Sequence, residues 1–206
     1  MTKRLNSKHK VDRRLKVNLW GRPKSPFNTR AYGPGQHGQT RSSKPSDYGI
    51  QLQAKQKLKA YYGNINEKQF RNIYKKANRG KGITGELLLQ LCESRLDNVV
   101  YRMGISKTRD GARQLVSHKH VLVDGKRVNI PSYRIKPGQE VTLSEKALKL
   151  GLVQSTLEQP SVVRPPWISF EAEKSSAKVI TLPDRETINF PLEISLVVEF
   201  YARSIK

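Results

Sequence analysis

Cationic side chains with the spacing of one binding surface are concentrated in residues 95–143 of this sequence. Within this segment, residues 106–118 have the periodicity of an amphipathic helix, with Arg109 and Arg113 four residues apart on one face. Thr108 stands at the start of this helix and is a residue type that caps helix N-termini. Because such a row of arginines and lysines neutralises phosphate groups, the pattern indicates binding of a polyanion.

A basic hairpin follows this helix directly. Residues 120–130 alternate apolar and polar side chains around Asp124-Gly125, a dipeptide that tolerates the positive φ angles of a two-residue turn. Lys126 and Arg127 begin the second strand. One interpretation is a phosphate-binding surface shared by helix and hairpin. The other is a small helix-plus-hairpin unit with an ordinary solvated charged face.

Other kinds of site have little support in the sequence. The single cysteine, Cys92, excludes an intrachain disulfide and a Cys₄ zinc site, and its apolar helical surroundings favour a buried residue over a nucleophile. Neither paired carboxylates in an apolar setting nor a Ser–His–acid pattern is present. His118 and His120 would share one face of a strand, where a nucleic-acid contact is favoured over a metal because further ligands are missing. We therefore expect no catalytic residue, metal, cofactor or small-molecule substrate.

The net charge indicates the class of partner. Among 206 residues, 39 are Lys or Arg and 17 are Asp or Glu, which gives a net charge of +22. Residues 1–60 hold 15 basic and 2 acidic residues, whereas residues 146–206 contribute only +1. Nucleic acid is the first candidate partner and an anionic membrane surface the second. No apolar run approaches the ~20 residues of a membrane span, and the N-terminus lacks the apolar core of a secretory signal. We therefore expect no membrane association, while an organellar setting stays open.

Residues 1–45 are rich in Pro, Gly, Lys and Arg and have almost no periodic apolar pattern. Such a segment is either a disordered tail or an extended arm that orders against RNA. Trp20 and Tyr32 could stack on bases or pack locally. Three glycines in Tyr32-Gly-Pro-Gly-Gln-His-Gly predict a tight loop, and a phosphate-binding P-loop is excluded because the Gly-Lys-Ser/Thr ending is missing.

Helical and strand patterns follow this arm. We predict helices over residues 50–61, 67–77 and 84–104, the last one long, continuous and capped by Thr84. Beyond the hairpin, the pattern predicts two short strands within 132–143, a weak helix over 146–157 and a strand pair at 167–171 and 178–182. The β-branched residues near the C-terminus, at 192–203, favour a further strand.

Several motifs together resemble a known family. Arg95-Leu-Asp-Asn-Val-Val-Tyr-Arg-Met-Gly, Ala112-Arg-Gln-Leu-Val-Ser-His and Val123-Asp-Gly-Lys-Arg-Val-Asn-Ile-Pro-Ser-Tyr closely resemble the S4 RNA-binding domain, in the version carried by bacterial-type small-subunit ribosomal proteins S4. Gly33-Pro-Gly-Gln-His-Gly, followed by Ser46-Asp-Tyr-Gly-Ile-Gln-Leu, is also similar to that family. Some members bind zinc through four N-terminal cysteines; none is present here, so we expect no zinc site.

The resemblance implies an α+β fold, with a helical domain and an inserted S4 domain whose helices pack on a small, mainly antiparallel sheet. The implied boundaries are 1–45 for a basic extended arm, 46–94 for the helical domain, 95–158 for the S4 RNA-binding domain and 159–206 for C-terminal strands and a terminal segment. Residues 190–206 are expected to complete the helical domain. The resemblance implies a short terminal helix packing on the N-terminal helices, where the residue types favour a strand.

The resemblance also implies a function. A member of this family is expected to be a structural constituent of the small ribosomal subunit, a primary binder of 16S-type rRNA that nucleates assembly of the subunit body. Implied partners are ribosomal proteins S5, S12 and S3 and the mRNA near its entry path, with an effect on translational accuracy and a cytoplasmic location. Two alternatives are an RNA-modifying enzyme that uses an S4 domain for targeting and a freestanding regulatory RNA-binding protein.

Charge and motif position single out the candidate rRNA contacts. In the S4-like segment they are Arg95, Lys107, Thr108, Arg109, Arg113, Gln114, His118, Lys119, Lys126 and Arg127. In the arm and the helices they are Arg13, Arg14, Arg22, Gln36, His37, Tyr48, Lys55 and Arg71. We expect Arg109 and Arg113 each to supply about one phosphate contact.

Overall fold

The computed structural model describes residues 7–40, 44–160, 162–172, 174–188 and 193–204, and predictions that fall on other residues lie outside it. The described residues form helices and one antiparallel sheet, which confirms the α+β fold class. The chain divides into two compact units. Unit 1 comprises residues 1–71 with 191–206, and unit 2 comprises residues 72–190.

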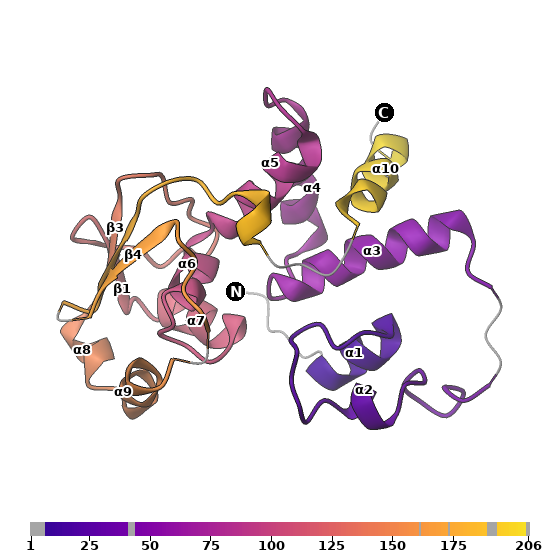
Figure 1. The fold of residues 1–206 in the computed structure, drawn as a ribbon, viewed down its shortest axis with the longest axis horizontal. Helices are drawn as coiled ribbons and strands as arrows, with labels where there is room; N and C mark the ends of the chain where they lie inside the picture. Colours follow the sequence, from indigo (N-terminus) through magenta and orange to yellow (C-terminus); the bar gives the residue numbers. More distant parts are fainter. Residues whose placement is uncertain (1–6, 41–43, 161, 173, 189–192, 205–206) are drawn as a thin grey trace. The chain divides into compact units, whose positions relative to one another are not determined.

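Unit 1 is helical and is centred on two helices that pack together, α3 (Asp47–Tyr61) and α10 (Ile194–Ser204) (Figure 1). The N-cap of α3 is Ser46, whose hydroxyl oxygen accepts a hydrogen bond from the Gly49 amide. One face of α10 is buried, and it carries Ile194, Val197, Phe200 and Tyr201. Burial of this face overrides the strand propensity of the β-branched residues, so the C-terminal segment is the helix implied by the family resemblance.

The N-terminal arm is only partly extended. It contains α1 (Lys8–Leu15) and α2 (Pro26–Thr29), so the expectation of an extended arm is wrong for these residues. Leu15 and Leu19 form a buried cluster with Ala60 of α3. The arm thus has an apolar partner distant in sequence, which its own composition does not reveal.

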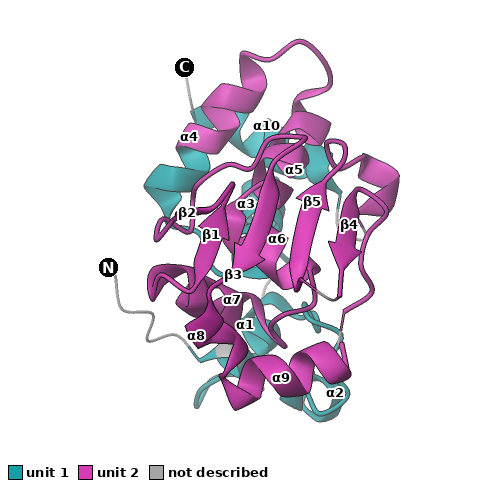
Figure 2. Cartoon of the chain, turned by 90° about the vertical axis from the view of Figure 1, so that its left-hand side faces the viewer, with its two compact units in different colours: residues 1–71, 191–206 teal, residues 72–190 magenta. Residues whose placement is uncertain are grey.

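Unit 2 is built on a sheet with the strand order β2-β1-β3-β5-β4 (Figure 2). All neighbouring strands are antiparallel, and the strands are β1 (Val121–Val123), β2 (Lys126–Arg127), β3 (Glu140–Leu143), β4 (Ile168–Glu171) and β5 (Ser176–Val179). Figure 2 shows α6 (Leu96–Arg102) and α7 (Arg109–Ser117) behind this sheet. Apolar residues of these helices and of alternate strand positions form one core, which covers one face of the sheet.

The long helix predicted over residues 84–104 is interrupted. α5 (Thr84–Glu93) ends before Arg95, which has extended backbone angles, and α6 begins after it. The reason is non-local: the Leu96 amide donates to the Tyr133 carbonyl at 2.8 Å, and the Ile135 amide donates to the Ser94 carbonyl at 2.8 Å. The Leu96 amide and the Ser94 carbonyl are therefore bonded to a segment about 40 residues away, whereas a continuous helix would pair them within itself.

Three further predictions need correction. The N-cap of α5 is Ile83 and not Thr84. Residues 132–143 supply only β3 and an isolated bridge between Arg134 and Arg95, instead of two strands. The predicted helix over 146–157 is divided into α8 (Glu145–Leu148) and α9 (Gly151–Glu158).

Other local predictions are confirmed. Thr108 caps α7 by accepting a hydrogen bond from the Gly111 amide at 3.1 Å. Asp124 and Gly125 have φ angles of 48° and 76°, as a two-residue hairpin turn requires. The late strand pair is present as β4 and β5, and α4 (Glu67–Asn78) lies where the second helix was predicted.

Candidate nucleic-acid interface

One group of exposed cations in unit 2 lies just before and just after α7 and on the β1–β2 hairpin. Of the ten residues predicted as RNA contacts in this segment, Thr108 and Arg113 are partly exposed, and six are exposed: Lys107, Gln114, His118, Lys119, Lys126 and Arg127. Lys119 turns the chain from α7 into β1 with a φ of 63°, and the rings of His118 and His120 stand 6.2 Å apart on either side of it. The two elements therefore present one run of polar and cationic side chains.

The sheet register fixes the hairpin part of this surface. Pairing of β1 with β2 places Arg127 opposite Leu122 and Lys126 opposite Val123. At the turn, Asp124 accepts hydrogen bonds from the Glu140 amide at 2.9 Å and the Gln139 side chain at 2.7 Å. These two bonds lower the pKa of Asp124 and tie the turn to the start of β3.

Arg109 belongs to the interior of unit 2. Its side chain donates from Nε to Asn98 Oδ1 at 3.0 Å, and its guanidinium lies 4.4 Å from the centre of the Tyr101 ring. Asn98 in turn donates to the carboxylate of Glu93. Arg102 makes a two-pronged contact with that same carboxylate, at 3.0 and 2.7 Å. A buried polar chain thus joins the end of α5, α6 and the first turn of α7.

A second contact set involves Arg95, which is only 2% exposed. Its guanidinium donates to both oxygens of Asp97, at 3.0 and 2.7 Å, while Arg113 approaches the same carboxylate at 3.8 Å. Arg95 and Arg109 were both predicted as RNA contacts, but the fold places them among internal partners. They are suited to hold α6 and α7 in position rather than to meet a phosphate at the surface.

The sequence contained a signal for this network that the prediction overlooked. Glu93, Asn98 and Arg102 lie among the apolar residues of two short helices, where Leu96, Val99 and Met103 are fully buried. Charged and amide side chains in such a setting are hydrogen-bonded to one another. The neighbouring Cys92 is buried too, and burial raises the pKa of its thiol to about 12, which excludes a thiolate nucleophile at neutral pH.

The predicted contacts of the arm fall into two groups. Arg14, Gln36 and His37 are exposed. Arg13 is engaged within the arm, and the guanidinium of Arg22 lies 5.8 Å from the centre of the Trp20 ring. Trp20 therefore packs locally in this structure, one of the two possibilities left open by the sequence.

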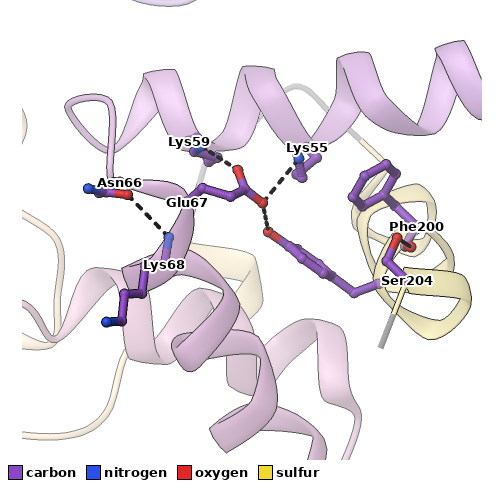
Figure 3. Close-up of polar contacts among 8 residues, drawn as sticks. Lys55, Lys59, Asn66, Glu67, Lys68, Phe200 and Ser204 are labelled. Carbon is purple, nitrogen blue, oxygen red and sulfur yellow. Dashed lines mark hydrogen bonds and ion pairs between the residues drawn. The ribbon is translucent and has the colours of Figure 1, made fainter. Parts of the chain in front are cut away.

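Three residues of unit 1 donate hydrogen bonds to the carboxylate of Glu67 (Figure 3). Its Oε1 accepts from Lys55 Nζ at 3.1 Å and from the Tyr201 hydroxyl at 2.7 Å, and its Oε2 accepts from Lys59. Burial alone would raise the pKa of Glu67, but hydrogen bonds from Lys59, Tyr201 and Lys55 lower it to about 2.

Lys55 is therefore committed to internal contacts. It is 7% exposed, and its ammonium lies 4.3 Å from the centre of the Phe200 ring in addition to its contact with Glu67. The remaining predicted contacts of unit 1, Tyr48 and Arg71, are exposed. Of the predicted set, the fold thus leaves Lys55, Arg95 and Arg109 buried and most of the others at the surface.

Among the described residues, no three His, Cys, Asp or Glu side chains are grouped so that they could hold a metal ion. No helix in the described part of the chain is both long enough and apolar enough to cross a bilayer.

Comparison with known proteins places the chain in a family. The family described as ribosomal protein S4/S9 N-terminal domain matches residues 3–93, and the S4 domain family matches residues 94–141. Small ribosomal subunit protein uS4 of Pelagibacter ubique (strain HTCC1062) is 54% identical over 205 residues, which cover 98% of this chain and 100% of the relative. The uS4 proteins of Phenylobacterium zucineum (strain HLK1) and Parvibaculum lavamentivorans are 55% and 52% identical, with 98% and 99% of this chain and all of each relative covered. The chain therefore belongs to the uS4 family of small ribosomal subunit proteins and carries an S4 domain.

Proposed function

We propose that this chain, a structural constituent of the small ribosomal subunit, is a primary binder of 16S-type rRNA that nucleates assembly of the subunit body. The observation that carries the proposal is the group of exposed cations at the two ends of α7 and on the β1–β2 hairpin, inside the segment that matches the S4 domain. Such a surface neutralises backbone phosphates where rRNA helices converge and responds to their shape rather than to base sequence.

The salt dependence of rRNA binding tests this proposal. We expect the affinity for 16S-type rRNA to fall steeply with KCl concentration, because each phosphate contact releases condensed counterions. Replacing Lys126 or Arg127 by Ala should reduce the slope of log affinity against log salt by about one contact each. An affinity that does not change with salt would contradict the proposed mode of binding.

The direct contacts proposed for the rRNA are the exposed and partly exposed members of the predicted set, except Arg13, whose guanidinium is bonded to the Tyr32 and Gly33 carbonyls. In unit 2 they are Lys107, Thr108, Arg113, Gln114, His118, Lys119, Lys126 and Arg127. In unit 1 they are Arg14, Arg22, Gln36, His37, Tyr48 and Arg71. Arg95, Arg109 and Lys55 support the surface from inside, and residues 95–158 are proposed as the RNA-binding domain.

Neighbouring macromolecules are part of the proposal as well. Within the subunit, the chain contacts ribosomal proteins S5, S12 and S3 and lies near the path by which mRNA enters, and it affects decoding accuracy through S5 and S12. The family resemblance supports these contacts. Crosslinking of reconstituted subunits followed by mass spectrometry tests them, since each contact predicts a crosslink to a named protein.

We further propose that the chain acts by binding and placement, without turnover, in the cytoplasmic small subunit, with an organellar ribosome as the alternative location. Membership of a ribosomal protein family supports this. Incubation of the chain with bulk rRNA, followed by nucleoside mass spectrometry, should leave every nucleotide unchanged. A new modified nucleoside would favour an RNA-modifying enzyme instead.

A further inference from the structure

We infer that Arg13 is a positioning residue that holds the loop of residues 32–38 against α1 and so presents Gln36 and His37 to the rRNA. This inference rests on the proposed function and deepens it. Charge and position alone suggested that Arg13 contacts RNA directly. Its contacts in the arm give it a different task.

Arg13 is held by three contacts with the loop. Its Nε donates to the Tyr32 carbonyl at 3.1 Å, and its Nη2 donates to the Gly33 carbonyl at 2.9 Å. Its guanidinium carbon lies 4.7 Å from the centre of the Tyr32 ring. A planar guanidinium can make a forked contact and stack on a ring at the same time, which the ammonium of a lysine cannot do. The side chain is therefore occupied by the protein itself.

The loop is closed on itself, so that fixing its beginning also fixes its tip. Gly33 and Gly38 approach so closely that a Cβ on Gly38 would lie 1.9 Å from the Gly33 carbonyl oxygen. The Gly38 amide donates to the Gly35 carbonyl at 3.2 Å, and Gly35 has a φ of 93°. Gln36 and His37 occupy the exposed tip between these two contacts.

The helix that carries Arg13 is itself anchored. The preceding residue, Asp12, is fully buried and accepts a hydrogen bond from the Ser25 hydroxyl, the N-cap residue of α2, at 3.1 Å. Leu15 and Leu19 are buried with Ala60 of α3. Arg13 therefore links the loop to the helical part of unit 1, whereas the next residue, Arg14, is exposed. Arg14 is a matched control with the same charge on the same helix.

The first experiment needs no RNA. Hydrogen exchange of the free full-length protein is measured over residues 31–40 in the wild type, Arg13→Lys, Arg13→Ala and Arg14→Lys. Both Arg13 variants should exchange faster in this segment, and Arg14→Lys should match the wild type. Unchanged exchange in both Arg13 variants would overturn the inference.

The second experiment is a double-mutant cycle on affinity for 16S-type rRNA. In the wild-type background, the double change Gln36→Ala with His37→Ala should weaken binding by roughly tenfold. In the Arg13→Lys background, the same double change should weaken binding by less than about twofold, because the loop is no longer presented. In the Arg14→Lys background, where the loop contacts of Arg13 are intact, the double change of the loop should retain its tenfold effect.

The outcomes separate this inference from the proposed function. The inference is wrong if Arg13→Lys binds like the wild type. It is also wrong if the double change of Gln36 and His37 weakens binding by the same factor in the wild-type and Arg13→Lys backgrounds, because Arg13 would then act as an ordinary cation. It is also wrong if the loop changes have no effect in the wild-type background. If the wild-type protein shows no salt-dependent affinity for rRNA at all, the proposed function fails, and the exchange experiment still decides whether Arg13 holds the loop.

Discussion

At the scale of single residues, two buried or half-buried carboxylates have opposite environments. Glu67 is surrounded by donors that favour its charge, from Lys55, Lys59 and Tyr201. Asp12 has lost its solvent and has fewer compensating bonds, so burial raises its pKa. Their contributions to stability should therefore respond to pH in opposite directions.

We expect Glu67→Gln to destabilise unit 1 by about 1–2 kcal/mol at neutral pH, because two ammonium groups lose their carboxylate; the value is reduced for solvent screening. The pKa of Glu67 is lowered from 4.5 to about 2 in the folded chain. Its stabilisation is thus fully present above pH 4.5 and is lost as the pH falls through about 2. Urea unfolding of both proteins, followed at several pH values, measures the difference between them.

The control for this experiment is Glu171→Gln. Glu171 pairs with Lys174 at 3.2 Å on the surface of unit 2, where both side chains are mostly exposed. Such a pair contributes little, so we expect a change of less than about 0.5 kcal/mol. Equal unfolding midpoints for wild type and Glu67→Gln at neutral pH would show that the four-residue contact does not stabilise the unit.

Asp12→Asn should have the opposite sign. The raised folded-state pKa means that Asp12 favours folding below its ordinary pKa of 3.8 and loses that contribution as the pH rises through the folded value. At neutral pH, removal of the buried charge should therefore slow exchange of the α1 amides relative to wild type. The difference in α1 amide exchange between Asp12→Asn and the wild type should shrink below pH 3.8. Asp12→Ala, which loses the bond to Ser25, should accelerate exchange instead.

At the scale of elements, the position of α7 depends on buried polar contacts as much as on its apolar face. We expect Arg109→Ala to lower the stability of unit 2 by about 2–4 kcal/mol, because Arg109 is only 8% exposed and bonded to Asn98. Lys126→Ala on the hairpin should leave stability within about 0.5 kcal/mol of wild type. Thermal unfolding separates the two variants.

Their rRNA binding should differ in a complementary way. Arg109→Ala should weaken binding without reducing its salt slope. The buried side chain contacts no phosphate, so its removal does not change the number of counterions released on binding. Lys126→Ala should reduce the slope by about one contact. This revises the expectation that Arg109 supplies a phosphate contact itself. A reduced slope for Arg109→Ala at unchanged stability would restore that expectation.

How far the sequence predicts the elements depends on how local their causes are. The Thr108 cap and the Asp124-Gly125 turn depend on neighbouring residues, and both are confirmed. The break at Arg95 was missed because its hydrogen bonds come from Tyr133 and Ile135, far along the chain. For the same reason, the sequence alone could not show that Arg13 meets the loop at Tyr32 and Gly33. Side-chain charge suggests a site, but only the fold decides which charges remain at the surface.

At the scale of the whole molecule, the excess charge and the apolar core lie in different places. Residues 1–60 hold 15 basic and 2 acidic residues, whereas the cluster of buried apolar side chains that forms the core of unit 2 begins at Leu96. Folding of unit 2 and the electrostatic part of rRNA binding should therefore be separable. An integral component would be held by many phosphate contacts, including those of the arm. A transient factor would associate through its S4 domain alone.

A truncation that removes residues 1–45 tests the separation. The stability of unit 2 should be unchanged, because the core of that unit contains no residue of the deleted segment. On a sucrose gradient after a high-salt wash, the full-length chain should remain with the small subunit in one copy, and the truncated chain should be released at lower salt. Release of the full-length chain into the light fractions would indicate a transient RNA-binding factor. Equal retention of both chains would mean that the S4 domain supplies most of the affinity, so that the charge of the arm serves another step such as early capture of the rRNA.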